Sequence, residues 1–231
     1  MKRKTFLFVG GIHRSGTSLL HEIIQSHPQV SGIQNSQSPE NEGQHLQSVF
    51  PTARSFGGPG RFGFDERSFM DERHPLATTA SAKKIFKQWS PYWDLRRRYL
   101  VEKSPPNLVR TRFFQALFRR SLFIIILRHP VAVAYATEKM SGADIASLIE
   151  HTLLCYERFL SDLPHLEQCF VLRYEDFVAN PKAVMDEVFR FAGLDPAPIH
   201  RQIRADVNEK YFKKWENDKP SILTQLPPGC E

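Results

Sequence analysis

The sequence of 231 residues contains little cysteine and no long apolar run. Its three cysteines, Cys155, Cys169 and Cys230, form an odd and scattered set without metal-ligand spacing, which argues against a disulfide framework and favours a reducing compartment. No apolar run approaches the roughly 18 residues that span a membrane, and the run after residues 2–4 is too short for a signal peptide. These absences exclude a membrane span and predict a cytoplasmic protein.

The composition is that of an ordinary globular protein. Hydrophobic residues make up 41% of the chain and charged residues 24%. At this length we expect a single domain over residues 1–231 with a substantial core. The formal net charge of +6 suggests an anionic ligand, but Lys and Arg form few tight clusters, which argues against nucleic acid as a partner.

Residues 6–20 have the pattern of a strand, a glycine-containing loop and a helix. The apolar residues Phe6–Val9 suit a buried strand. Gly10 and Gly11 then turn the chain, and apolar residues recur at helical spacing as far as Ile24. In such a unit the N–H groups of the loop and the positive end of the helix dipole converge on one point, so we predict an anion site there.

This loop nearly matches the pattern G-x-x-x-x-G-K-[ST], which binds nucleoside triphosphates. Gly11 and Gly16 have the required spacing and Ser18 stands at the magnesium-binding hydroxyl, but Thr17 replaces the lysine. The basic residue lies three positions upstream, at Arg14. Because a guanidinium offers a planar fork of donors to one tetrahedral oxyanion, the loop predicts anion transfer without a metal.

Strand-like and helix-like segments alternate along the rest of the chain. Short apolar segments predict further strands at 99–102, 122–127 and 170–172. Helical spacing and capping residues predict helices over 78–93, 105–118, 145–160 and 181–192, and Pro130 suits the first turn of another. We therefore expect a doubly wound, mainly parallel α/β sheet with a phosphate loop, in a three-layer α/β/α arrangement.

Two segments between these elements read as loops. Residues 31–48 are polar and carry Glu40, Glu42 and His45, so we expect an ordered loop there. Residues 50–75 are rich in Gly, Pro, Phe and Arg and have no clear periodicity, which predicts a long surface loop.

Basic residues follow the predicted strands. They are His13 and Arg14, Lys103, Arg128 and Arg173. Because ligands of doubly wound sheets bind beyond the carboxyl ends of the strands, we expect these side chains to meet at one rim. The arrangement predicts a site for a polyanion.

Five segments resemble motifs of the sulfotransferases that use 3′-phosphoadenosine-5′-phosphosulfate (PAPS). Arg14–Ser18 is similar to the 5′-phosphosulfate loop, and Ile126–Pro130 to the strand-end arginine of the 3′-phosphate motif. Glu102–Pro105 and Val171–Asp176 resemble elements of the tyrosylprotein and carbohydrate branch. Asn208–Trp215 stands where relatives close a C-terminal segment over the nucleotide.

This resemblance, which extends over about residues 5–216, implies PAPS as co-substrate, adenosine 3′,5′-bisphosphate as product, and no metal. It implies that the 5′-phosphosulfate is held by Arg14, Ser15, Gly16, Thr17 and Ser18, with Arg14 and Lys103 stabilising the transferring group. It implies that the 3′-phosphate and the rest of the nucleotide contact Arg128, Tyr174, and Lys213 or Lys214 in a closing segment at 207–216.

One position departs from the family pattern. Relatives have a serine eight residues after the arginine of the 3′-phosphate motif, where this chain has Ala136. The nearest hydroxyl, on Thr137, lies about 100° further round the helix. We expect one hydrogen bond to the 3′-phosphate to be missing or supplied from elsewhere, with Thr137 as the nearest candidate.

An acceptor hydroxyl needs a base. Glu42 lies where carbohydrate-type relatives carry a catalytic glutamate, and is the first candidate. Glu40 is the second because the register of the loop is open, and His45 is the third. The acceptor stays open between carbohydrate, tyrosine, lipid and small alcohol. We expect aromatic residues of 50–98 to line its site, namely Phe56, Phe62, Phe64, Phe69 and Trp89.

Two other functions are considered. A P-loop kinase or nucleotide hydrolase would share the fold, but Thr17 replaces its lysine, and Arg128 follows the strand where such enzymes place a magnesium-binding aspartate. A non-catalytic nucleotide-binding module is suggested by Ala136 alone.

Overall fold

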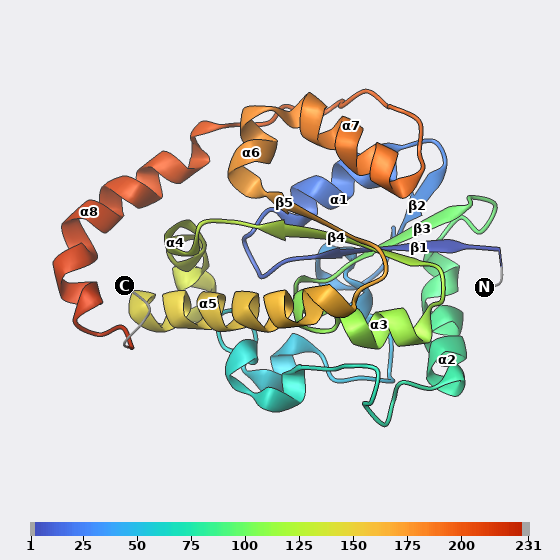
Figure 1. Ribbon diagram of the computed structural model, residues 1–231, viewed down its shortest axis with the longest axis horizontal. Coiled ribbons are helices and arrows are strands. Elements are labelled where there is room, and N and C mark those ends of the chain that lie inside the picture. The colour runs from blue at the N-terminus through green and yellow to red at the C-terminus, as the bar shows by residue number, and fades with distance from the viewer. Residues whose placement is uncertain (1–2, 228–231) are drawn as a thin grey trace.

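The strands of the described residues, 3–227, form one sheet in the order β2–β3–β1–β4–β5, and every neighbouring pair is parallel (Figure 1). This computed structural model places β1 at Thr5–Gly10, β2 at Val30–Gly32, β3 at Tyr99–Lys103, β4 at Ser121–Leu127 and β5 at Cys169–Arg173. The predicted strands are confirmed. The edge strand β2 was not predicted, since three residues are too few to show an apolar period.

The side chains of β1 alternate between two layers of helices. Phe6 and Phe8 pack in one core with α2 (Thr79–Trp89), α3 (Thr111–Leu117) and α5 (Ile145–Asp162). Leu7 and Val9 pack in the other with α1 (Thr17–Ser26), α6 (Tyr174–Ala179) and α7 (Pro181–Ala192). Figure 1 shows these two groups of helices on opposite faces of the sheet. The predicted three-layer, doubly wound α/β fold is confirmed.

The order of the strands opens a crevice beside β1. After β1 the chain builds β2 and β3 on one side, and it then crosses to build β4 and β5 on the other. The loops that leave β1 and β4 therefore diverge at their carboxyl ends. At this end of the molecule, α4 (Pro130–Ser141) and α8 (Glu209–Leu223) share an apolar cluster with α5 (Figure 1).

The prediction of a single helix over residues 105–118 is wrong. Pro105–Val109 forms a 3₁₀ turn, and α3 begins only at Thr111. Between them, Arg110 has a φ of −137°, and its buried guanidinium donates to the carbonyl oxygens of Ser68 at 3.0 Å and Pro51 at 2.9 Å. The break thus directs Arg110 toward the 50–75 segment.

Residues 50–75 contain no α-helix or strand, but they do not lie wholly on the surface. They form the 3₁₀ turns Ala53–Phe56, Phe62–Phe64 and Glu66–Ser68, and they bury Phe62 and Met70 in the core shared with β1. Trp89 is fully buried as well, and its indole N–H donates to the Gly43 carbonyl at 2.9 Å. The expectation that Phe62 and Trp89 line an acceptor site is therefore wrong.

Within residues 3–227, no helix has both the length and the apolar character that crossing a bilayer requires. Cys155 and Cys169 are free thiols, and Cys230 lies outside the described residues. The cytoplasmic location stays a prediction.

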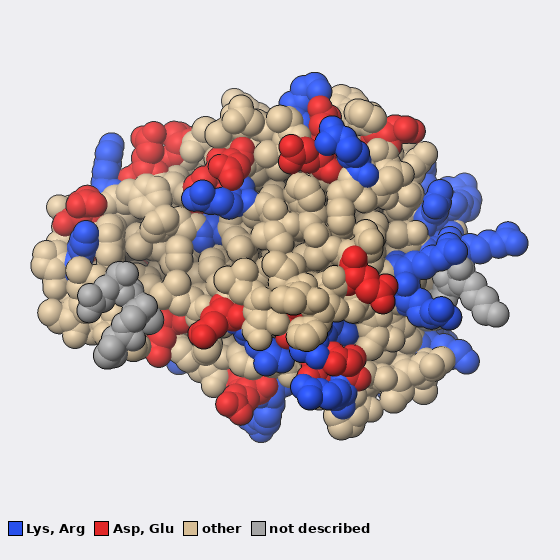
Figure 2. All heavy atoms as spheres, in the orientation of Figure 1, with Lys and Arg blue, Asp and Glu red and all other residues tan. Residues whose placement is uncertain are grey.

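On the face in Figure 2, acidic and basic side chains are mixed, and Lys and Arg gather at the end of the molecule near the N-terminus, away from α8.

Candidate functional site

The loop between β1 and α1 depends on two glycines. A Cβ on Gly11 would lie 2.6 Å from the Ile126 carbonyl oxygen, so only glycine lets the loop run this close to β4. Gly16 has a φ of +105°, and a Cβ there would lie 2.7 Å from the Tyr174 ring. No side chain of the described residues caps α1, so the N–H groups of its first turn are open to an anion.

A cleft of about 340 Å³ lies where this loop meets the ends of β3, β4 and β5. Several residues that the sequence led us to expect at the site line this cleft, namely Arg14, Gly16, Thr17, Ser18, Glu40, Glu42, Arg128 and Tyr174. Lys103 joins them through ion pairs with both glutamates. The basic side chains that follow three separate strands therefore meet at one edge of the sheet.

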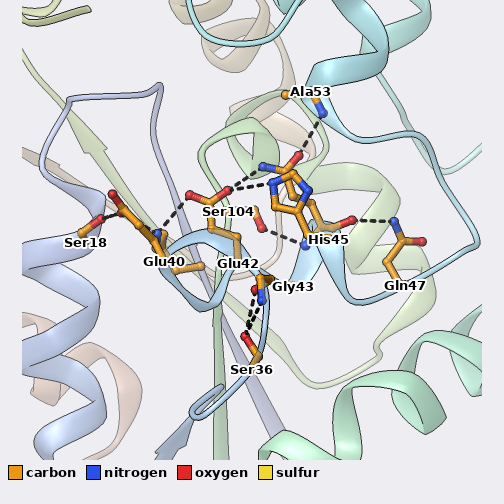
Figure 3. Close-up of polar contacts among 12 residues, drawn as sticks. Ser18, Ser36, Glu40, Glu42, Gly43, His45, Gln47, Ala53 and Ser104 are labelled. Carbon is orange, nitrogen blue, oxygen red and sulfur yellow. Dashed lines mark hydrogen bonds and ion pairs between the residues drawn. The ribbon is translucent and has the colours of Figure 1, made fainter. Parts of the chain in front are cut away.

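Lys103 is the centre of an ion-pair network at the end of β3. Its ammonium donates to Glu42 Oε1 at 3.1 Å and to Glu40 Oε2 at 3.3 Å, although its side chain is only 1% exposed. Glu40 Oε2 also accepts from the Ser18 hydroxyl at 2.5 Å. Figure 3 shows the row of contacts from Ser18 through Glu40 to Glu42. The polar 31–48 segment thus carries both carboxylates to the phosphate loop.

The two glutamates have different surroundings. The Glu42 side chain is 9% exposed and that of Glu40 is 58% exposed. Glu42 Oε2 accepts from the Gln44 amide at 2.6 Å and lies 3.7 Å from His45 Nε2. The Ser18 hydrogen bond is the main cause that lowers the pKa of Glu40, and burial lowers the pKa of His45. Glu42 is therefore the most enclosed of the three candidate bases.

A third carboxylate, which sequence analysis did not single out, lies behind this network. Glu102 is buried and accepts from the Ser104 hydroxyl at 2.5 Å, the Asn107 amide at 2.6 Å and the Gly43 N–H at 2.9 Å. Burial raises the pKa of Glu102 to about 7. The sequence held one signal for this buried carboxylate. Side chains alternate along a strand, so Glu102 of β3 lies on the opposite face of the sheet from Lys103.

Arg128, just after β4, has neutral partners. Its guanidinium donates to Asn208 Oδ1 at 3.0 and 2.5 Å and to the Arg14 carbonyl at 2.7 Å. It also lies 4.3 Å from the centre of the Tyr174 ring and 5.6 Å from that of Tyr211. Burial lowers the pKa of Arg128, but an arginine stays charged at neutral pH. No carboxylate within residues 3–227 forms an ion pair with it.

The start of α8 contributes residues that were not assigned a role from the sequence. Asn208 ends a 3₁₀ turn that begins at Asp206, and its amide donates to Glu175 Oε1 at 2.8 Å. Lys210 and Tyr211 line the cleft on the next turn. The predicted closing segment 207–216 is thus mostly helix, which fixes which of its side chains reach the cleft.

Thr137 and Ser15 do not reach the cleft. Thr137 is 2% exposed and lines a separate small cavity, whereas Ala136 lines the cleft. Because one residue turns a helical side chain by about 100°, Thr137 is not placed to bind a 3′-phosphate. The Ser15 side chain is fully buried and its backbone N–H donates to the Ile12 carbonyl at 3.1 Å, so neither group is free to contact an anion.

Three further cationic residues are not among the described residues that line the cleft. Lys213 is exposed, and so is Arg173 at the end of β5. Lys214 pairs with Glu138 at 3.1 Å and lines an adjoining groove instead. Lys210, one turn earlier in α8, takes the position that the sequence led us to expect of Lys213.

In the described part of the chain, no three His, Cys, Asp or Glu side chains group in a way that could hold a metal ion. A reaction without metal stays a prediction, since a nucleotide can bring its own cation to a cleft.

The sequence profile of the sulfotransferase family matches residues 7–198. The protein-tyrosine sulfotransferase 2 of Gallus gallus is 24% identical over 211 residues, which cover 84% of this chain and 52% of that protein. The protein-tyrosine sulfotransferase 1 of Danio rerio is 23% identical over 214 residues, which cover 87% of this chain and 57% of that protein. The chain thus spans about half the length of these relatives.

Two solved structures resemble this fold. The sulfotransferase domain from the curacin biosynthetic pathway has a TM-score of 0.55 at 19% identity, covering 97% of this chain and 99% of that one. The sulfotransferase domain of the Synechococcus PCC 7002 olefin synthase has a TM-score of 0.57 at 20% identity, covering 92% and 90%. At these identities the likeness shows the shared fold.

Proposed function

Because the chain belongs to the sulfotransferase family, we propose that it transfers a sulfuryl group from PAPS to an acceptor hydroxyl and releases adenosine 3′,5′-bisphosphate. One observation carries this proposal: the phosphate loop, Lys103 and two glutamates meet at one cleft. Such a junction combines an anion site, a cation for the transferring group and a base, which are the parts that group transfer requires. We also propose that the chain is a single catalytic domain, which the one shared sheet supports.

The phosphate loop is the proposed site of the 5′-phosphosulfate. Backbone N–H groups of Arg14 and of residues 16–18, at the N-terminus of α1, bind its oxygens, and Thr17 and Ser18 line the same space. Negative charge grows on the bridging oxygen as its bond to sulfur breaks. Donors already directed at that position stabilise the transition state more than the ground state.

Lys103 and Glu42 act on the transferring group and on the acceptor. The acceptor oxygen forms a bond to sulfur, the bond from sulfur to the phosphate oxygen breaks, and the acceptor proton passes to Glu42. The ammonium of Lys103 contacts Glu42 in the structure, and an arriving phosphosulfate offers it a competing anionic partner. This exchange frees a lone pair on Glu42 for the acceptor proton.

Glu42 is the proposed base rather than Glu40. The hydrogen bond from Ser18 lowers the pKa of Glu40, which makes that carboxylate a weaker base. Glu42 is shielded from water, and the Gln44 amide donates a hydrogen bond to it at 2.6 Å. A base that is already fixed in position loses little entropy when the acceptor binds, and the Glu40 side chain, at 58% exposed, is more open to water.

The 3′-phosphate is assigned to Arg128 and to cations of α4 and α8. A groove of about 400 Å³ shares Arg14, Ala136 and Lys210 with the cleft, and Lys139 and Lys214 line it as well. These cations take over the role of the hydroxyl that is missing at Ala136. The number of these cations supports a nucleotide that carries a second phosphate rather than a nucleotide that lacks it.

Ligand-dependent stability tests this function. Adenosine 3′,5′-bisphosphate at 100-fold excess over its Kd, without magnesium, should raise the free energy of unfolding by about 2.7 kcal/mol. Stabilisation by ATP with magnesium and not by the bisphosphate would support a kinase or hydrolase instead. Transfer of labelled sulfate from PAPS is then measured with carbohydrates, small alcohols and tyrosine peptides, the last because two relatives are protein-tyrosine sulfotransferases. Binding without transfer to any acceptor would favour a non-catalytic module.

A further inference from the structure

A small buried cavity lies behind the phosphate loop. It has a volume of about 10 Å³, and residues of that loop, of the 50–75 segment, of α4 and of α5 line it. His13 lines this cavity and also lines the cleft. The residue therefore connects the interior of the protein with the proposed phosphosulfate site.

Two polar atoms of residues that line the cavity have no hydrogen-bond partner in the described part of the chain, namely His13 Nδ1 and Thr137 Oγ1. Thr152 also lines the cavity, and its hydroxyl donates to the Leu148 carbonyl at 2.8 Å, which leaves its lone pairs available. A buried polar atom without a partner is costly. One water molecule needs roughly 10–15 Å³ and two to four polar partners, and this cavity offers about that much space and three such atoms.

We propose that one water molecule in this cavity bridges His13 Nδ1 and Thr137 Oγ1, and that the bridge orients His13 so that its Nε2–H donates to the anion in the cleft. The inference rests on the proposed function only for the identity of that anion. His13 is then a ligand-contacting residue. Thr137 is a positioning residue that acts through the water, which gives this buried hydroxyl a use other than the phosphate contact expected from the sequence.

The state of the imidazole follows from its surroundings. Burial lowers the pKa of His13 to about 3, so the ring is neutral at physiological pH. A neutral imidazole has one donor and one acceptor nitrogen. An acceptor Nε2 would turn a lone pair toward an anion, whereas an acceptor Nδ1 can take a hydrogen bond from the water. Phe62 packs edge-on against the ring at 5.8 Å between centroids, which restricts its rotation.

The unmodified protein provides the first test. Long-range ¹H–¹⁵N correlation spectra report which nitrogen of His13 carries the proton, and His13→Gln identifies its signals. We expect the Nε2–H tautomer with and without adenosine 3′,5′-bisphosphate. We also expect one ordered water in the cavity in an experimental density map. An Nδ1–H tautomer, or an empty cavity in a map that shows other buried waters, overturns the proposal.

A matched pair of variants provides the second test. Thr137→Val keeps the shape of the side chain and removes the hydroxyl, so we expect a mixture of His13 tautomers and about fivefold weaker binding of the bisphosphate. Thr137→Ser keeps the hydroxyl and should retain both properties. A valine variant with unchanged His13 signals and unchanged affinity contradicts the bridge. If the valine variant does not fold, the wild-type measurements decide; if wild type does not bind the bisphosphate, the proposed function fails while the tautomer and the water still test the bridge.

Discussion

The part of the cleft around Arg128, proposed for the nucleotide and here called the nucleotide half, and the part around Lys103, proposed for the acceptor and here called the acceptor half, balance their charges in different ways. In the nucleotide half, the partners of Arg128 are an amide oxygen, a carbonyl oxygen and two aromatic rings. In the acceptor half, Lys103 is paired with the carboxylates of Glu40 and Glu42. The positive charge of Arg128 is thus available to a ligand, whereas that of Lys103 is already neutralised within the protein.

This difference indicates that basic residues at one edge of a sheet can serve different steps of a reaction, namely binding and group transfer. An arginine with neutral partners attracts a polyanion as the ligand approaches. A lysine that is already paired with a carboxylate attracts an anion less. When such a lysine moves to a new anionic partner, however, the proton affinity of the carboxylate that it leaves changes. We therefore expect substitutions in the two halves to separate rate from binding.

The largest effect is expected from Glu42→Gln, which removes the proposed base and keeps the shape of the side chain. Turnover should fall about 10²–10⁴-fold because general base catalysis is lost. The affinity for adenosine 3′,5′-bisphosphate, measured by titration calorimetry, should be retained. Glu40→Gln is the matched control and should lose much less activity. A larger loss in the Glu40 variant would move the base to the exposed carboxylate.

Lys103→Met comes next and tests whether the paired lysine belongs to the acceptor half. Removing a preorganised positive charge from the transferring group should lower kcat about 10²–10³-fold. Affinity for the bisphosphate, which lacks the sulfuryl group, should change far less. Equal losses in kcat and in affinity would instead place Lys103 with the nucleotide.

Arg128→Ala should weaken binding rather than chemistry. Charge-assisted hydrogen bonds contribute roughly 1.5–3 kcal/mol, so the Kd of the bisphosphate should rise about 10- to 150-fold. Binding of AMP, which has no 3′-phosphate, should change much less, and Asn208→Ala should have a smaller effect on both ligands. If the affinities for AMP and the bisphosphate fall equally, Arg128 does not recognise the second phosphate.

The smallest effect concerns Glu102, whose carboxyl group has a raised pKa of about 7 because of burial. The folded state binds this proton more tightly than the unfolded state, so the contribution of this group to stability should fall by about 2 kcal/mol as pH rises from 5 to 7. The buried His13, His21 and His151, whose pKa values are lowered by burial, contribute in the opposite direction over the same range. Urea unfolding at both pH values measures the slope. The difference in slope between wild type and Glu102→Gln isolates this group, and an unchanged slope in the variant would exclude a contribution from Glu102.

The layers of the fold could be predicted because they depend on local patterns of apolar residues. The helix expected at 181–192 is α7 with the same bounds, and the strand expected at 122–127 lies within β4. The 50–75 segment could not be predicted in this way. Its burial depends on Phe62 reaching the core and on Arg110 holding its carbonyl groups, and both contacts join distant parts of the chain.

Which charged residues follow the strands could be read from the order of residues along the chain. Parallel strands bring their carboxyl ends to one edge, so Arg14, Lys103 and Arg128 could be expected to meet from their positions after the strands. The ion-pair and hydrogen-bond partners of these charged groups, in contrast, depend on the folded structure. Lys103 and Glu42 are 61 residues apart in sequence. The reason is physical: burial, hydrogen-bond partners and the rotation of a helix depend on contacts between distant segments, which no local pattern encodes.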